Sequence, residues 1–192
     1  IAIYEEGKVV FSSILPVGSN HITKDIVYGL RTTIDIAEKM KLTFAAARKP
    51  NAKDSTKLDL SKIGAKGTLL QPELDMIVSS RLDELCELIK TEIARSGKER
   101  LLSNGLVLTG GGAKLEGLAD YVESEVGIPA TVGEPHGITG IIDKVKDPSF
   151  SAPVGLMLED LDRPQTGKTI NDRIGQLFGR AQSLFQGFLN RG

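Results

Sequence analysis

The sequence has little of what several large classes of protein require. Its 192 residues include one cysteine, two histidines and no tryptophan. One cysteine excludes a disulfide framework or a cysteine-cluster zinc site, and two distant histidines give little material for a metal site. The 24 basic residues are balanced by 25 acidic ones, a formal net charge of −1. This balance argues against a protein that reads the phosphate backbone of nucleic acids.

Long hydrophobic runs are also missing. No stretch reaches the roughly 18 apolar residues that suggest a membrane-spanning helix. Hydrophobic residues still make up 40% of the chain, which is enough for a core at about the length of one domain. The sequence opens on Ile-Ala-Ile-Tyr with no initiator methionine. We expect it to begin partway through a larger protein, inside a strand.

The first 45 residues predict a hairpin followed by two helices. Residues 1–4 and 8–15 are β-rich, and the Glu-Gly pair between them is a hairpin signal. Ser19 or Asn20 is a plausible cap for a helix that runs to residue 30. A second helix carries Met40 and is capped at one of two alternatives, Thr32 or Thr33.

The middle of the chain changes character near residue 45. Polar, turn-rich sequence with short β-compatible pieces fills residues 45–72, and residues 72–94 then form the clearest helical pattern. Its apolar residues recur at steps of three and four: Leu74, Ile77, Val78, Leu82, Leu85, Leu88, Ile89 and Ile93. We interpret the region as a small subdomain inserted into the main one.

Three consecutive glycines follow a short apolar run at residues 105–109. Gly110, Gly111 and Gly112 let the backbone approach a ligand, and a following helix, predicted over residues 115–126, would offer free N–H groups. A tight strand-to-helix connection explains three glycines equally well. A strand is predicted again at residues 128–132, and the strand–helix–strand order favours an α/β architecture.

Glu38 and Lys41 lie three residues apart and therefore share one helix face. A carboxylate can accept hydrogen bonds from ribose hydroxyls, and a lysine stem can cover a base while its ammonium stays in water. The alternative, favoured by the spacing alone, is a solvated ion pair.

Several of these segments, in this order, resemble the second half of an actin-like ATPase. A further stretch, Gly-Ile-Thr-Gly at residues 137–140 followed by residues 151–156, narrows the resemblance to the FtsA family of bacterial cell-division proteins. The resemblance covers essentially the whole chain. The other segments that carry it are residues 1–8, 22–26, 37–41 and 108–113.

The resemblance implies an α/β fold, an actin-like (ribonuclease H-like) ATPase lobe with a mixed sheet and flanking helices. It divides the chain into a first part of the lobe (1–45), an inserted α+β subdomain (46–98), a second part of the lobe (99–160), a linker (161–170) and an amphipathic helix (171–192).

In that family ATP with Mg²⁺ lies between two lobes. By resemblance, Gly110, Gly111 and Gly112, with Ala113 and Lys114, form the adenosine-side turn. Glu38 and Lys41 would reach the ribose and the adenine. The phosphate and metal contacts would lie outside this chain, so we expect the 192 residues alone neither to hydrolyse ATP nor to bind it tightly.

The resemblance also implies that the inserted subdomain docks the C-terminal peptide of FtsZ. Such an apolar, acidic peptide needs an apolar groove with cations at its rim. Lys62, Lys66 and Arg81 are candidates for that rim, and ordinary surface charge is the alternative for each.

The C-terminal residues predict a membrane-binding helix without any family knowledge. Residues 164–192 contain four basic residues and one acidic residue, Asp172, a net charge of +3 that leaves −4 for the rest of the chain. The basic residues are Lys168, Arg173, Arg180 and Arg191. Three of these cations, Arg173, Arg180 and Arg191, lie near one edge of an apolar stripe, where their guanidinium groups could reach lipid phosphates. A helix packed on protein is the alternative. The stripe consists of Ile174, Leu177, Phe178, Ala181, Leu184, Phe185, Phe188 and Leu189.

These features together predict an assembly-type ATPase. By resemblance it would polymerise with itself at the cytoplasmic face of the cell membrane, at the division site, and tether FtsZ there beside other division proteins. Two alternatives remain at this stage: a PilM-like pilus-assembly protein that binds ATP, and a metabolite kinase of the same superfold. Neither alternative explains the arginine-edged terminal helix.

Overall fold

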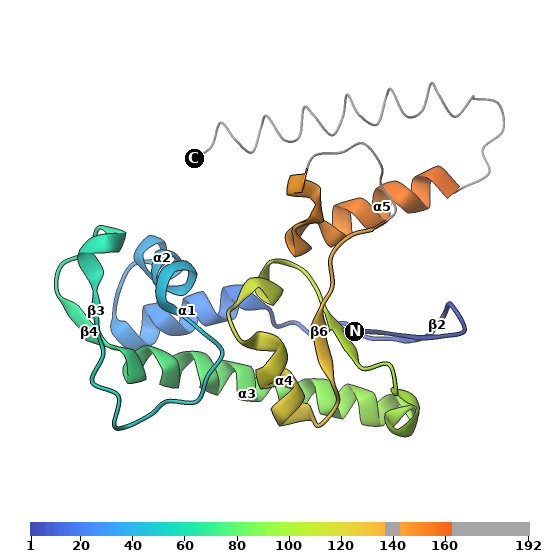
Figure 1. The fold of residues 1–192 in the computed structure, drawn as a ribbon, viewed down its shortest axis with the longest axis horizontal. Coiled ribbons are helices and arrows are strands. Elements are labelled where there is room, and N and C mark those ends of the chain that lie inside the picture. The colour runs from blue at the N-terminus through green and yellow to red at the C-terminus, as the bar shows by residue number, and fades with distance from the viewer. Residues whose placement is uncertain (137–142, 163–192) are drawn as a thin grey trace. The chain divides into compact units, whose positions relative to one another are not determined.

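Residues 1–136 and 143–162 are described by the structure, a computed structural model, and they form six strands and five α-helices. The chain divides into two units, residues 1–133 and 134–192. The first unit contains strands β1 (Ala2–Glu5), β2 (Lys8–Ser12), β3 (Lys57–Asp59), β4 (Thr68–Leu70), β5 (Leu106–Leu108) and β6 (Ala130–Val132), with helices α1 (Ser19–Leu30), α2 (Ile34–Phe44), α3 (Gln71–Ser96) and α4 (Leu118–Val126) (Figure 1).

The predicted hairpin at the start of the chain is confirmed. Strands β1 and β2 pair antiparallel, and the two turn residues, Glu6 and Gly7, both have positive φ, 51° and 76°. Two such residues give a turn whose twist matches that of the strands. Strand β2 ends at Ser12, which pairs with Ala2, rather than at residue 15 as predicted.

Helices α1 and α2 lie where the sequence predicts them, with one different cap. Thr33 caps α2, since its Oγ1 accepts a hydrogen bond from the Ile36 N–H at 3.5 Å. Ser19 is already helical in α1, and Gly18 takes the cap position instead of Ser19 or Asn20. The Gly18 N–H donates to His21 Nδ1 at 3.2 Å, and the His21 N–H donates to the Gly18 carbonyl oxygen at 2.8 Å, so backbone and side chain of His21 hold the start of the helix without a polar cap residue.

Helix α3 is the longest helix described, and two other helices of the first unit pack against it. The prediction of a helix over residues 72–94 is confirmed and extended by one residue at its start and two at its end. Leu74, Val78 and Leu82 are buried along one face, and the helix ends where Gly97 takes a left-handed conformation with φ 68°. Helices α1 and α4 both pack against α3, as Figure 1 shows.

The strands pair in three two-stranded sheets, and in the described residues the expected single mixed sheet is not formed. The pairs β1–β2 and β3–β4 are antiparallel, whereas β5–β6 is parallel. Each pair joins strands that follow one another in the chain, the most local pairing available to each. The parallel pair with α4 between its strands confirms the predicted strand–helix–strand unit.

Helix α4 begins at Leu118, not at residue 115 as predicted. Gly117 has φ 74° and the residue before it, Glu116, is bridged to Ala46. The Ala47 N–H donates to the Glu116 carbonyl oxygen at 2.7 Å. This bridge holds the backbone after the glycine turn out of helical geometry.

The second unit is described over residues 134–136 and 143–162. It contains two 3-10 helices, Asp143–Lys146 and Pro148–Phe150, and helix α5 (Ser151–Asp162), which holds the segment 151–156. Residues 137–140 and the predicted terminal helix 171–192 lie outside the described residues. Within the described ranges no helix is long and apolar enough to span a membrane. The predicted domain boundaries stay predictions.

Candidate functional site

The glycine turn packs against the first turn of α1. Gly110 has φ 88°, and Gly111–Lys114 forms a 3-10 helix. A Cβ atom placed on Gly112 would lie 3.3 Å from the Ser19 Cβ, a tight contact to which Ser19 would have to adjust by a few tenths of an ångström. Ala113 is buried behind the turn, whereas Gly111 and Lys114 are exposed. The turn thus presents backbone at the surface beside Ser19.

Glu38 and Lys41 reach the same helix turn from α2. Lys41 Nζ lies 2.8 Å from Glu38 Oε2, 2.8 Å from Thr23 Oγ1 and 3.5 Å from the Ser19 carbonyl oxygen. The ion pair predicted from the spacing is therefore present. The structure brings it to Ser19, the residue that Gly112 contacts. Two consecutive helices and a glycine turn that is distant in sequence therefore meet at Ser19.

The expectation that the Lys41 ammonium stays in water is wrong. The Lys41 side chain is only 9% exposed, because its ammonium has three acceptors inside the protein. Glu38 is 41% exposed and is the open member of the pair. Burial by itself raises the pKa of Glu38, but hydrogen bonds from Lys41 and Thr23 outweigh it and hold the pKa below its ordinary value of 4.5.

Thr23 is the member of this cluster that the sequence analysis does not identify. Its hydroxyl donates to Glu38 Oε2 at 2.5 Å and accepts from Lys41 Nζ. The spacing in the sequence does place Thr23 beside Ser19: the two residues are four apart and therefore share one face of α1. That face meets the glycine turn and the Glu38–Lys41 pair together.

A second feature is a hollow of about 600 Å³ between α1 and α3, and Arg81 borders it. Arg81 Nε and Nη2 donate to both carboxylate oxygens of Asp25, at 2.6 and 2.8 Å, and Nη1 pairs with Glu84. These partners raise the pKa of Arg81, and the hydrogen bonds that Arg81 donates to Asp25 do so most of all. The lining residues are Asp25, Gly29, Leu30, Glu73, Met76, Ile77, Ser80, Arg81 and Glu84.

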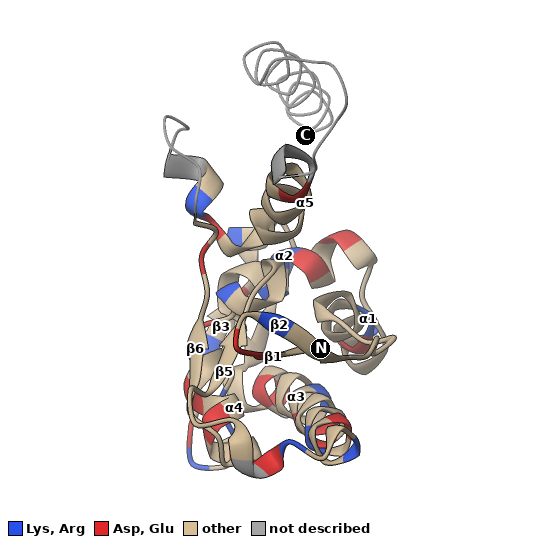
Figure 2. Cartoon of the chain, turned by 90° about the vertical axis from the view of Figure 1, so that its right-hand side faces the viewer, with Lys and Arg blue, Asp and Glu red and all other residues tan. Residues whose placement is uncertain are grey.

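Lys62 and Lys66 do not lie in that lining. Lys62 belongs to the 3-10 helix Leu60–Ile63 and Lys66 to the turn before β4, and both are exposed. The structure therefore does not bring the three predicted rim cations to one pocket. Along α3 the two signs of charge are interspersed, as Figure 2 shows, and Arg81 pairs with carboxylates on two helices.

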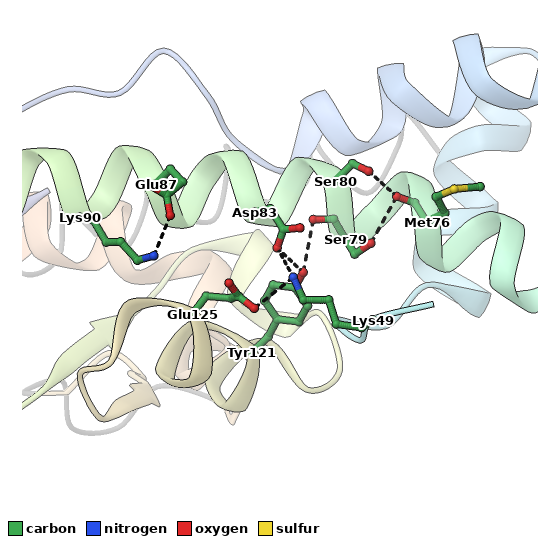
Figure 3. A network of polar contacts seen from close by, with 9 residues as sticks. All are labelled: Lys49, Met76, Ser79, Ser80, Asp83, Glu87, Lys90, Tyr121 and Glu125. Atoms are coloured by element: carbon green, nitrogen blue, oxygen red, sulfur yellow. Dashed lines mark hydrogen bonds and ion pairs between the residues drawn. The ribbon is translucent and has the colours of Figure 1, made fainter. Parts of the chain in front are cut away.

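A third polar cluster joins α3 to α4 (Figure 3). Lys49 Nζ lies 2.5 Å from Asp83 Oδ1, 3.0 Å from Glu125 Oε1 and 4.9 Å from the centre of the Tyr121 ring. The Tyr121 hydroxyl donates to Asp83 at 2.6 Å. Burial, then the Asp83 hydrogen bond, raises the pKa of Tyr121 to about 12. This cluster fastens the helix behind the glycine turn to the helix that carries Arg81.

Comparison with known proteins gives consistent results over most of the chain. Residues 1–155 match the family model described as "Cell division protein FtsA". A cell-division protein FtsA from Pseudomonas aeruginosa is 32% identical over 173 residues, which cover 89% of this chain and 42% of the relative. One from Borreliella burgdorferi is 34% identical over 82% of this chain and 39% of the relative. The chain thus spans about two fifths of the length of these relatives.

A solved structure is similar in fold. MreB5 of Spiroplasma citri, in a crystal structure described as bound to ADP, superposes with a TM-score of 0.57 over 83% of this chain and 49% of the other. The two sequences are 18% identical, so this likeness concerns the fold alone.

Proposed function

The chain belongs to the FtsA family of cell-division proteins and has an actin-like fold, and from this we propose that it forms one side of an adenine-nucleotide site in a filament-forming protein that tethers FtsZ to the membrane. One observation carries the nucleotide part: the Gly112 turn and the Glu38–Lys41 pair converge on the first turn of α1. The MreB5 structure, bound to ADP, supports the same assignment.

In the proposed site the chain supplies the base and sugar contacts. Gly110, Gly111 and Gly112, with Ala113 and Lys114, offer exposed backbone, and the open carboxylate of Glu38 accepts hydrogen bonds from ribose hydroxyls. Lys41 contributes from behind, through its bond to Glu38. Phosphate and Mg²⁺ would be held by residues outside these 192, and ATP turnover would need the complete site.

Adenosine is the right probe, because it lacks the phosphates that this half-site does not hold. We expect the chain to bind adenosine weakly in a ligand-observed NMR titration, and Glu38→Gln to reduce the affinity roughly tenfold. Asp35→Asn is the matched control, since Asp35 is exposed on the same helix, and it should bind as the parent does. Equal affinities for parent and Glu38→Gln would reject the assignment.

We propose the hollow at Arg81 as the place where the FtsZ peptide docks. Leu30, Met76 and Ile77 would receive its apolar side chains, while Arg81 would exchange part of its bond with Asp25 for a peptide carboxylate. Arg81→Glu should weaken binding of a synthetic FtsZ C-terminal peptide at least tenfold. Lys90→Glu, further along α3, is the control and should leave binding unchanged. Lys62 and Lys66 remain proposals for more distant contacts.

The terminal helix is proposed to hold the protein at the inner face of the cytoplasmic membrane, at the division site. The proposal rests on its sequence: Arg180 at the edge of the stripe Ile174, Leu177, Phe178, Leu184, Phe185, Phe188 and Leu189. Phe185→Glu should release the chain from anionic vesicles in a co-sedimentation assay. Equal co-sedimentation of variant and parent would reject the anchor.

A further inference from the structure

The hydroxyl of Thr23 is bonded to both charges of the Glu38–Lys41 pair. It accepts from Lys41 Nζ at 2.8 Å and donates to Glu38 Oε2 at 2.5 Å. A threonine hydroxyl has one proton, so a hydroxyl that accepts from an ammonium gives that proton to the carboxylate. Bonds of this length between a hydroxyl and a carboxylate are charge-assisted and among the strong ones in proteins. Thr23 therefore fixes the carboxylate in one orientation.

Two of the three side chains are buried, and the third is partly exposed. Thr23 and Lys41 are 3% and 9% exposed, whereas the Glu38 side chain is 41% exposed. Thr23 and Lys41 both bond to Oε2 of the Glu38 carboxylate. The other oxygen, Oε1, is the atom of this cluster that a ligand can reach without moving a buried group.

We propose that Thr23 is a positioning residue of the adenosine half-site: by holding Glu38 Oε2 against Lys41 it presents Oε1 to the sugar hydroxyls of the nucleoside. This inference rests on the proposed nucleotide function. An acceptor that is already fixed loses less rotational freedom when the ligand binds, so it contributes more to affinity than a mobile one. Thr23 touches no ligand itself and acts only through Glu38.

The arrangement also assigns the sugar rather than the base to this cluster. The Glu38 carboxylate accepts but cannot donate; a ribose offers it two hydroxyl donors side by side, whereas the base of a nucleoside offers only its amino group. Loss of the Thr23 hydroxyl should therefore weaken binding of adenosine much more than binding of free adenine. A general loosening of the helix would weaken both.

The test compares two substitutions by ligand-observed NMR titration of the 192-residue chain with adenosine and with adenine. Thr23→Val keeps the shape of the side chain and removes the hydroxyl, and we expect adenosine to bind roughly tenfold more weakly. Thr23→Ser keeps the hydroxyl and should restore affinity to within about twofold. Adenine affinity should not change in either variant.

Ile26→Val is the control for stability. Ile26 is fully buried on the same helix, so this change lowers the midpoint of thermal unfolding while it removes none of the polar groups of the cluster. It should leave both affinities as in the parent. If Thr23→Val does not fold, Thr23→Cys, of nearly equal size but a weak donor, takes its place.

Two results would overturn the inference and a third would remove its basis. Parental adenosine affinity in Thr23→Val, together with weak binding by Glu38→Gln, would reject the positioning role and leave the nucleotide site intact. Equal losses for adenosine and adenine would assign Thr23 a structural role only. Absence of adenosine binding by the parent would reject the proposed site and the inference with it.

Discussion

Two neighbouring side chains of α1 anchor the helix in different ways. Thr23 faces α2 and is bonded to a buried lysine, whereas Asp25 faces α3 and pairs with Arg81 at the edge of a hollow. Residues two apart point to different sides of a helix, so one short segment serves both contacts. The cations differ in burial: Lys41 is 9% exposed and Arg81 19%. The lysine depends on its protein partners more than the arginine does, since water can replace lost partners of Arg81.

The largest effect on stability should come from breaking the ion pair of the more buried cation, Lys41. Glu38→Gln keeps the shape of the side chain but leaves the Lys41 ammonium buried without a counter-charge, and we expect a loss of about 2–3 kcal/mol in the free energy of unfolding. The loss is below the range for fully buried pairs because Glu38 is partly exposed. Urea-induced unfolding measures it, and Asp35→Asn is the control.

The same pair predicts how stability depends on acid. The folded-state pKa of Glu38 lies below its ordinary value of 4.5, so the carboxylate stabilises the fold above that value and its contribution is lost as the pH falls through the folded pKa. The difference in stability between parent and Glu38→Gln should therefore shrink below pH 4.5. A difference that stays constant down to pH 2 would contradict the assigned ion pair.

A smaller effect is expected on the other side of α1. Asp25→Asn removes a bidentate pair but leaves Arg81 bonded to Glu84 and close to water, so the expected loss is about 1 kcal/mol. A double-mutant cycle with Arg81→Gln separates the pair from other effects and should give a coupling of similar size. If Asp25→Asn costs as much as Glu38→Gln, burial of the cation does not govern the difference.

The sequence predicted the elements and the pair more readily than what lies around them. The steps of three and four residues located α3, and the spacing of Glu38 and Lys41 placed them on one face. The burial of Lys41 depends on Thr23 and Ser19, which reach it from another helix. No pattern within α2 contains that information.

Contacts between distant parts of the chain also explain why the sequence predicted the wrong start for α4 and did not predict the partner of Arg81. The start of α4 moves to Leu118 because Glu116 is bridged to Ala46, a contact across a long stretch of chain. Arg81 is identified from its helix, but its partner Asp25 is far away in sequence. Local signals predict local structure, whereas tertiary contacts decide caps, burial and the partners of charges.

The smallest effect should be found at Lys49, which is 52% exposed and extends the comparison to a third cation. Lys49→Met removes bonds to Asp83 and Glu125 and should lower the free energy of unfolding by less than about 1 kcal/mol, since water solvates the carboxylates that remain.

Lys49→Met also removes the cation that lowers the pKa of Tyr121, so tyrosinate should form above the parental value of about 12. Because this folded-state pKa exceeds the ordinary value of 10.0, the contribution of Tyr121 to stability is present below pH 10 and lost between about pH 10 and 12. Ultraviolet titration of the parent, Lys49→Met and Tyr121→Phe measures the shift, since Tyr121→Phe lacks that late step. A lower tyrosinate midpoint in Lys49→Met would contradict the contacts drawn in Figure 3.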